Sequence, residues 1–269
     1  QTNQKLHAER PADTEVSEAL ARIAGARGEQ TLAVQYLEQL AQRSTSPIDA
    51  ARLQRRRAEV FEHGGDFAAA RDALTRALDH QSDDKEALAG LRRLAEKAED
   101  WQSVVGVAAR QAALSTGREQ VERFAEIARI WEEKLGDGLV AADAWRKVLE
   151  LATDDKEALS RLTALTDAAG DWAAFVEYGR GYLAHVEGRD RTALLRRLGD
   201  ACAQHLRRED DALRFYESAT AGAHADSLAS AALERLLAAR GENASLVELL
   251  IRRSRGATST TEKAAALAK

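Results

Sequence analysis

Cys202 and His205 are the residues whose types and spacing come nearest to a reactive pair in this sequence. Three residues apart on a helix, they share a face, where a thiolate nucleophile with an imidazole base, or half of a metal site, is conceivable. The helical pattern, however, puts Cys202 at the inward position that Phe61 and Trp131 occupy in two other segments. We therefore interpret Cys202 as a small buried hydrophobe and expect no catalytic residue and no metal ligand.

A glycine motif, Gly136-x-Gly138-x-x-Ala141, matches the letters of a dinucleotide-binding fingerprint. That fingerprint needs a preceding strand and a helix whose N-terminus points at a pyrophosphate. Here the preceding segment, residues 121–135, has the pattern of a helix. We interpret the glycines as a turn between two helices and expect no cofactor.

Three pairs of adjacent acidic residues could suggest general acid–base chemistry. Each pair stands near the start of an expected helix, where a carboxylate accepts hydrogen bonds from free backbone N–H groups and interacts well with the helix dipole. Capping is the better explanation, so we expect a protein that is not an enzyme. The pairs are Asp83-Asp84, Asp154-Asp155 and Asp210-Asp211.

The densest basic cluster consists of Arg52, Arg55, Arg56 and Arg57. On a helix, Arg52, Arg55 and Glu59 point roughly the same way, and nearby acids can pair with the arginines along the helix surface. Two interpretations stay open. The cluster is either a solvated helix face or a contact point for an acidic segment of a partner, because arginine binds carboxylates through two parallel hydrogen bonds.

The composition favours a folded all-α protein. Hydrophobic residues make up 45% of the 269 positions, alanine makes up about a fifth, and only two prolines interrupt the chain. A single cysteine excludes an internal disulfide framework. The net charge of -5 argues against a nucleic-acid partner, and no apolar run approaches the roughly 18 residues needed for membrane insertion.

The N-terminal residues are not expected to form a targeting signal. Gln1 is not an initiator methionine, and residues 1–20 lack the apolar core of a signal peptide. The chain also stops at Lys269, within what we expect to be a new helix. We expect a fragment of a longer protein, with a cytoplasmic location as the default.

One interval of 71 residues recurs along the chain. The sequence DDKEAL occurs at residues 83–88 and again at 154–159, and the same offset carries Trp101 onto Trp172. Each period splits into two halves of about 35 residues, with apolar residues at helical spacing and glycine between the two helices. A helix pair with one apolar stripe per helix buries that stripe only by stacking on the next pair.

This periodicity predicts seven helix-turn-helix units between a short lead-in, residues 1–12, and the start of a further unit, residues 256–269, which is cut off. A discontinuous helical bundle is the alternative. The seven units span residues 13–44, 49–81, 84–115, 119–152, 155–187, 190–221 and 226–255.

At these residues the chain resembles the tetratricopeptide repeat (TPR) family, whose motif of about 34 residues pairs two helices with small residues at their crossings. Unit 49–81 matches it with Ala58, Phe61, Ala70 and Leu74. The resemblance implies a right-handed α-solenoid, and the two-unit period is similar to the long arrays of large bacterial scaffolds. HEAT-like and other α-solenoids remain alternatives.

The resemblance also implies a protein-interaction scaffold or adaptor, whose first helices line a concave groove that takes a peptide or helix of a partner protein. A regulatory or substrate-presenting segment of a larger enzyme is one alternative, and an RNA-binding helical repeat is another. With only Asn3 and Asn243, the chain lacks the asparagines of the TPR subset that grips a terminal carboxylate. Carried over by register, the groove includes Arg52, Arg55, Glu59, Glu86, Arg93, Lys97, Glu126, Glu157, Arg196 and Asp200.

The signs of these groove residues alternate, so we expect a mixed surface and not a uniformly basic one. Reversing Arg52 and Arg55 to glutamate is expected to weaken partner capture and to leave thermal unfolding almost unchanged. The sequence names neither the partner nor the oligomeric state.

Overall fold

The structure is a computed structural model that describes residues 14–221 and 225–256. Within these ranges the regular secondary structure comprises fourteen α-helices and one short 3-10 helix, which confirms the expected all-α fold. The lead-in expected at residues 1–12 lies outside the described residues, as do residues 257–269 of the expected further unit.

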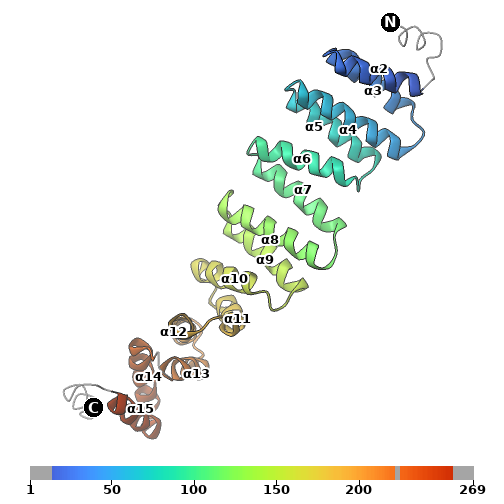
Figure 1. The fold of residues 1–269 in the computed structure, drawn as a ribbon. Coiled ribbons are helices and arrows are strands. Elements are labelled where there is room, and N and C mark those ends of the chain that lie inside the picture. Colours follow the sequence, from blue (N-terminus) through green and yellow to red (C-terminus); the bar gives the residue numbers. More distant parts are fainter. Residues whose placement is uncertain (1–13, 222–224, 257–269) are drawn as a thin grey trace. The chain divides into compact units, whose positions relative to one another are not determined.

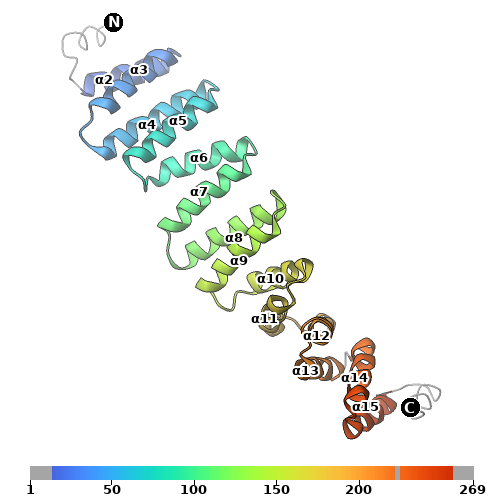
Figure 2. The same cartoon turned by 180° about the vertical axis from the view of Figure 1, so that it is seen from behind.

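The chain forms two compact units, one ending at Ala144 and the other beginning at Trp145. In the first unit each helix from α2 to α7 packs against the next one along the chain (Figure 1, Figure 2). The helix α9 (Gly138–Leu151) contains the boundary between the units. The other helices of the first unit are α2 (Thr14–Ala26), α3 (Gln30–Arg43), α4 (Pro47–His63), α5 (Phe67–His80), α6 (Lys85–Lys97), α7 (Trp101–Leu114) and α8 (Gly117–Glu133).

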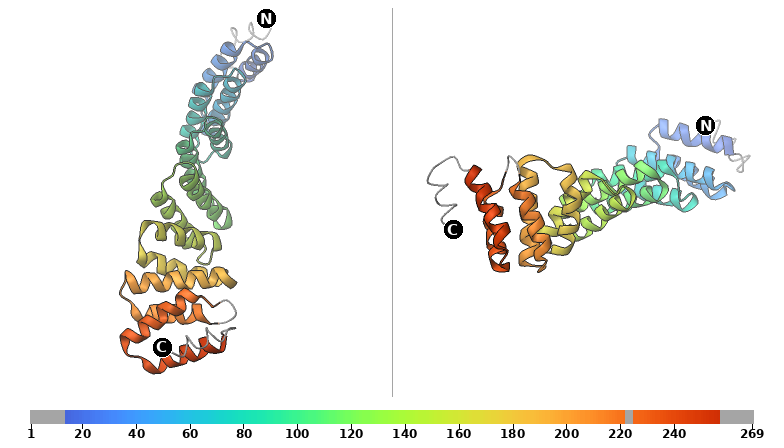
Figure 3. Two further views of the ribbon diagram at one scale, coloured as in Figure 1. Left: turned by 90° about the vertical axis from the view of Figure 1, so that its left-hand side faces the viewer. Right: turned by 90° about the horizontal axis from the view of Figure 1, so that it is seen from below.

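The second unit repeats this sequential packing from α10 to α15, as further views also show (Figure 3). Short turns join the helices in antiparallel pairs, so each pair can bury its apolar stripe against a neighbouring pair. Its elements are α10 (Lys156–Ala169), α11 (Trp172–Tyr182), η1 (Leu183–His185), α12 (Gly188–Gln204), α13 (Glu209–Thr220), α14 (Ser227–Arg240) and α15 (Asn243–Gly256).

Acidic residues set the starts of several helices. Oδ1 of Asp84 and Oδ1 of Asp155 each accept a hydrogen bond of 2.9 Å from the backbone N–H three residues further on. These bonds satisfy donors that a helix leaves free in its first turn. Capping is therefore confirmed for two of the three acidic pairs. Asp210 differs, because it lies inside the first turn of α13 and accepts a hydrogen bond of 2.6 Å from Arg240 Nη1.

Glycines end helices at positions that require a left-handed backbone. Gly170 follows α10 with φ 70°, and Gly136 lies in the turn between α8 and α9 with φ 69°. Glycine adopts this conformation at little cost because it has no Cβ. A helix, not a strand, precedes Gly136, so the glycine motif forms a turn between helices.

Small residues form the helix crossings, and larger apolar residues fill the spaces between them. Ala58, Ala70 and Ala77 are at most 1% exposed where α4 and α5 meet. Alanine lets two helix backbones approach closely while still giving a good helix propensity. The buried cluster around these residues also contains Leu74 and Leu88.

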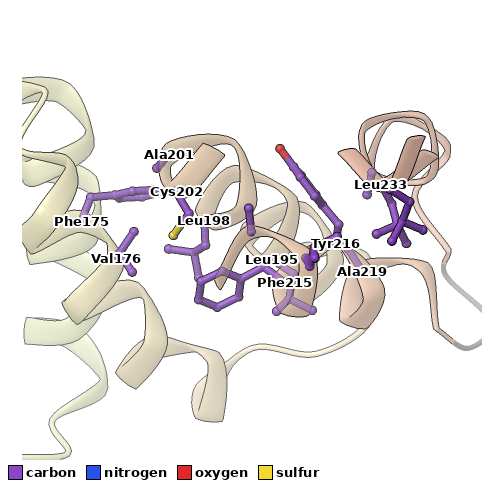
Figure 4. Close-up of a cluster of buried hydrophobic side chains, with 14 of the residues drawn as sticks. Phe175, Val176, Leu195, Leu198, Ala201, Cys202, Phe215, Tyr216, Ala219 and Leu233 are labelled. Carbon is purple, nitrogen blue, oxygen red and sulfur yellow. The ribbon is translucent and has the colours of Figure 1, made fainter. Parts of the chain in front are cut away.

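Cys202 belongs to the buried apolar cluster of the second unit (Figure 4). It is 0% exposed, and burial raises the pKa of its thiol, which is opposite to the change that would make a nucleophile. The exposed His205 follows α12 and stacks on Trp172, with ring centroids 4.0 Å apart. The interpretation of Cys202 as a buried hydrophobe is confirmed.

Candidate functional site

The ten residues predicted for the groove all lie on the first helix of a helix pair. We call α2, α4, α6 and α8 the first helices of the first unit, and α10, α12 and α14 those of the second unit. The helices α3, α5, α7, α11, α13 and α15 are the second helices. Seven of the predicted residues belong to α4, α6 and α8, and three belong to α10 and α12. We describe them unit by unit.

Arg55 and Glu86 are two predicted groove residues that the structure brings together. Arg55 Nη1 lies 3.2 Å from Glu86 Oε2, and Arg55 Nε lies 3.1 Å from Asp84 Oδ2. The Asp84 side chain is only 1% exposed, and the same carboxylate caps α6. A buried carboxylate needs such compensation, because burial removes its hydration.

Other predicted residues pair with acids or arginines on the neighbouring first helix. Arg52 Nη2 donates a hydrogen bond of 2.8 Å to Glu18 on α2, and this bond raises the pKa of Arg52. Arg93 on α6 pairs with Glu62 on α4 at 2.6 Å. Glu126 on α8 accepts hydrogen bonds from both Nη atoms of Arg92 on α6. Ion pairs therefore link α2 to α4, α4 to α6, and α6 to α8.

Glu59 and Lys97 are more exposed than most of this set. Lys97 Nζ lies 3.9 Å from the ring centroid of Phe67, the first residue of the second helix α5. A cation over an aromatic face is attracted by the negative centre of the ring. Lys97 is thus held toward α5, whereas Glu59 borders a groove described below.

In the second unit, Arg196 and Asp200 form a pair within α12. Arg196 Nη1 donates to Asp200 Oδ2 at 3.0 Å, and its Nε lies 3.4 Å from Oδ2 of Asp226, the residue that caps α14. Asp200 Oδ1 accepts a hydrogen bond of 2.9 Å from the Tyr216 hydroxyl. Burial, and then this hydrogen bond, raise the pKa of Tyr216. Glu157 is partly buried on α10.

The sequence pattern did not predict the partners of these groove residues. The structure adds four residues that contact predicted groove residues, namely Glu18, Glu62, Asp84 and Arg92. The sequence separation could have identified the hydrogen-bonded partners, because the two residues of each such pair lie 31 or 34 residues apart, close to one repeat length.

The ion pairs change what we expect from reversing Arg52 and Arg55. A glutamate at position 55 would face Asp84 and Glu86, and one of these carboxylates is buried. Removing one partner of a buried ion pair destabilises a protein strongly. The double reversal would therefore perturb folding as well as binding, and cleaner variants are needed.

A groove opens between α2 and α4 in the first unit, and we call it the α2–α4 groove. Its volume is about 330 Å³, and Leu37 of α3 forms part of its lining. The two first helices thus provide the walls, and the second helix between them in sequence provides the floor. Arg22, Arg56 and Glu59 add charge. The remaining lining residues are Ala21, Gly25, Gln30, Val60 and His63.

A second hollow, of about 420 Å³, lies in the other unit between the end of α13 and the helices α14 and α15. Arg252 and Arg253 contribute to its lining. Both already have acidic partners, since Arg252 bonds Glu248 at 3.1 Å and Arg253 bonds Glu234 at 3.2 Å. This hollow has fewer uncompensated cations than the α2–α4 groove.

Residues 14–221 and 225–256 contain no group of three or more histidine, cysteine or acidic residues arranged to hold a metal ion. In the same part of the chain, no helix combines the length and the apolar composition that a bilayer crossing requires.

Comparison with known proteins finds solved structures of similar fold. No protein-family model and no curated protein matches the sequence. Among solved structures, MamA is 13% identical with a TM-score of 0.36, covering 64% of this chain and 90% of that chain. A tetratricopeptide repeat protein from Parabacteroides merdae is 12% identical with a TM-score of 0.37, covering 93% and 96%.

The structure of Naa15/Naa10 bound to HypK-THB is 15% identical with a TM-score of 0.49, covering 87% of this chain but only 36% of that chain. Identities this low bear on the fold alone. The sequence repeat, the sequential helix pairs and the alanines at their crossings show that each of the two units is an all-α solenoid of TPR-like repeats.

Proposed function

We propose that this chain is a protein-interaction scaffold or adaptor module, and that its first helices present the surface for a peptide or helix of a partner protein. The strongest support for this proposal is the character of the surface that the first helices form in the first unit. There the first helices carry charges of both signs, and the α2–α4 groove opens between two of them over an apolar floor.

The ion pairs divide this surface into two kinds of residue. Arg55, Arg92 and their acidic partners hold adjacent first helices in register, because each pair joins two helices. Exposed charges such as Glu59 and Lys97 remain accessible to a partner. A mixed surface of this kind favours a partner with its own pattern of charges, since like charges in the wrong place oppose binding.

The test compares charge swaps on the two kinds of helix. The first variant combines Glu59→Lys with Lys97→Glu on first helices. The matched control combines Asp79→Lys with Arg110→Glu on the second helices α5 and α7, where both residues are exposed. Neither variant changes the net charge. Quantitative affinity capture from cell extract would measure which proteins each variant retains.

We expect specific partners to be retained by the parent and by the control, and lost by the first-helix variant. Equal retention by both variants would overturn the assignment of binding to the first helices. Unfolding midpoints within about 2 °C of the parent would show that each swap acts on binding, because exposed substitutions usually change stability by about 0.5 kcal/mol or less.

A further inference from the structure

The α2–α4 groove lies at a junction where two positions carry smaller side chains than their equivalents at the α6–α8 junction. The 71-residue offset equates Gly25 of α2 with Glu96 of α6, and Val60 of α4 with Trp131 of α8. Glu96 accepts a hydrogen bond of 2.7 Å from Arg92. At Gly25 that side chain is missing, and an added Cβ would meet nothing within 4 Å. The repeat thus leaves unfilled space at this place.

The lower part of this space is apolar. Leu37 is 3% exposed and Ala21 is 6% exposed, and the partly buried Val60 lines the same groove. A volume of about 330 Å³ lies at the small end of the range for ligand pockets, which starts at about 300 Å³. One large apolar side chain, such as phenylalanine or leucine, fits a space of this size.

The charged lining of the groove is cationic in balance. Arg22 is exposed, and Arg56 lies 3.9 Å from Glu18, a carboxylate that Arg52 already holds at 2.8 Å. Glu59 is the single carboxylate among the described lining residues. The exposed Arg22 is therefore available to a carboxylate that approaches the groove from outside, and Arg56 can exchange its long contact with Glu18 for such a carboxylate.

We propose that the α2–α4 groove binds a partner segment in which a large apolar side chain stands within two residues of an aspartate or glutamate. The apolar side chain enters the groove above Leu37, and the carboxylate reaches Arg22 and Arg56. This inference rests on the protein-interaction function proposed above and names the class of segment that the surface recognises.

The test uses the full chain and three fluorescein-labelled peptides with one serine–glycine frame. Two central positions carry phenylalanine with aspartate, phenylalanine with lysine, or serine with aspartate. Fluorescence anisotropy measures their affinities. We expect the phenylalanine–aspartate peptide to bind at least about fivefold more tightly than either of the others, since each lost contact is equivalent to about 1 kcal/mol.

Two matched glycine variants show where the peptide binds. Gly25→Leu fills the groove, and Gly106→Leu makes the same change on α7, outside it; at both positions an added Cβ would meet nothing within 4 Å. Neither glycine is among those with positive φ, so leucine is compatible with both helices. We expect Gly25→Leu to weaken the phenylalanine–aspartate peptide at least about tenfold and Gly106→Leu to leave it unchanged.

The outcomes separate this inference from the function on which it rests. Equal affinities for the three peptides, or equal effects of the two glycine variants, would overturn the groove assignment. If the first-helix charge swap still removes specific partners in that case, the interaction function stands and the groove is not its recognition site. If neither assay distinguishes its variants, both proposals fail.

Discussion

Two junctions of the first unit, α2–α4 and α6–α8, occupy equivalent places in the repeat, but one carries an open groove and the other is covered by charged side chains. At the α6–α8 junction, Arg92 on α6 forms ion pairs both with Glu96 on the same helix and with Glu126 on α8, so charged side chains cover this junction. At the α2–α4 junction, the positions of Arg92 and Glu96 are taken by Ala21 and Gly25, and a groove remains. The helix arrangement is thus set by the repeat, whereas a few side chains decide whether a junction is closed or open.

The comparison requires that the two junctions rest on equivalent buried positions. Leu74, Trp145 and Tyr216 are related by the 71-residue offset, and all are at most 4% exposed despite their different chemistry. We expect Trp145→Ala, at a side chain that is 0% exposed, to lower the free energy of unfolding by about 3–5 kcal/mol. Urea denaturation measures this. A loss below about 1 kcal/mol would break the equivalence of the register.

The next test concerns the pairs that hold first helices together. We expect Arg55→Glu to cost about 2–3 kcal/mol, because it leaves the buried Asp84 beside a second acid, with a discount for the partial exposure of Arg55. Arg52→Glu, at a pair that is 41% and 32% exposed, should cost less than about 1 kcal/mol. Thermal or urea unfolding of the two single variants compares them. Equal losses would mean that burial of Asp84 contributes nothing.

Gly25→Ala tests the packing at the open α2–α4 junction. Alanine has the better helix propensity, and its methyl group meets no neighbour, so we expect about 0.5–1 kcal/mol of added stability. Gly65→Ala is the matched control, because Gly65 has φ 79° and alanine is strained there. The two variants should shift the urea midpoint in opposite directions. A loss of stability in Gly25→Ala would show that Gly25 is required by packing.

A similarly small effect is expected at the closed junction. A double-mutant cycle of Arg92→Ala and Glu126→Ala should give a coupling of about 0.5–1 kcal/mol, because both side chains are about three-quarters buried but still reached by solvent. The coupling should fall in about 1 M salt, where the screening length is near 3 Å. A coupling that persists unchanged at high salt would indicate packing in place of charge.

The sequence was sufficient for the fold because a repeat expresses the same local physics many times. Apolar spacing identified the helices, and the acids before apolar runs identified caps such as Asp84 and Asp155. The burial of Cys202 followed from its register with bulky inward residues. Each of these predictions depends on neighbours within one helix pair.

The candidate surface was harder to predict because it depends on contacts between repeats. Register placed Arg55 and Glu86 on first helices, but it did not show that they pair with each other. The α2–α4 groove lies where Gly25 and Val60 have smaller side chains than Glu96 and Trp131, the residues equivalent to them in the repeat. A helical pattern reports which side chains are present, and it gives no volume for the space that a missing side chain leaves.

The carboxylates of Asp84 and Asp226 each cap one helix and also form an ion pair with an arginine of the preceding first helix. If the cap opens, the arginine loses its ion-pair partner. The preceding first helix, which begins more than one repeat length earlier in the chain, is then destabilised as well. Fraying at such a helix start therefore costs both the capping hydrogen bond and the ion pair. Amide hydrogens near these two caps should exchange more slowly than those at the start of α13, whose N-cap residue Arg208 makes no capping hydrogen bond through its side chain.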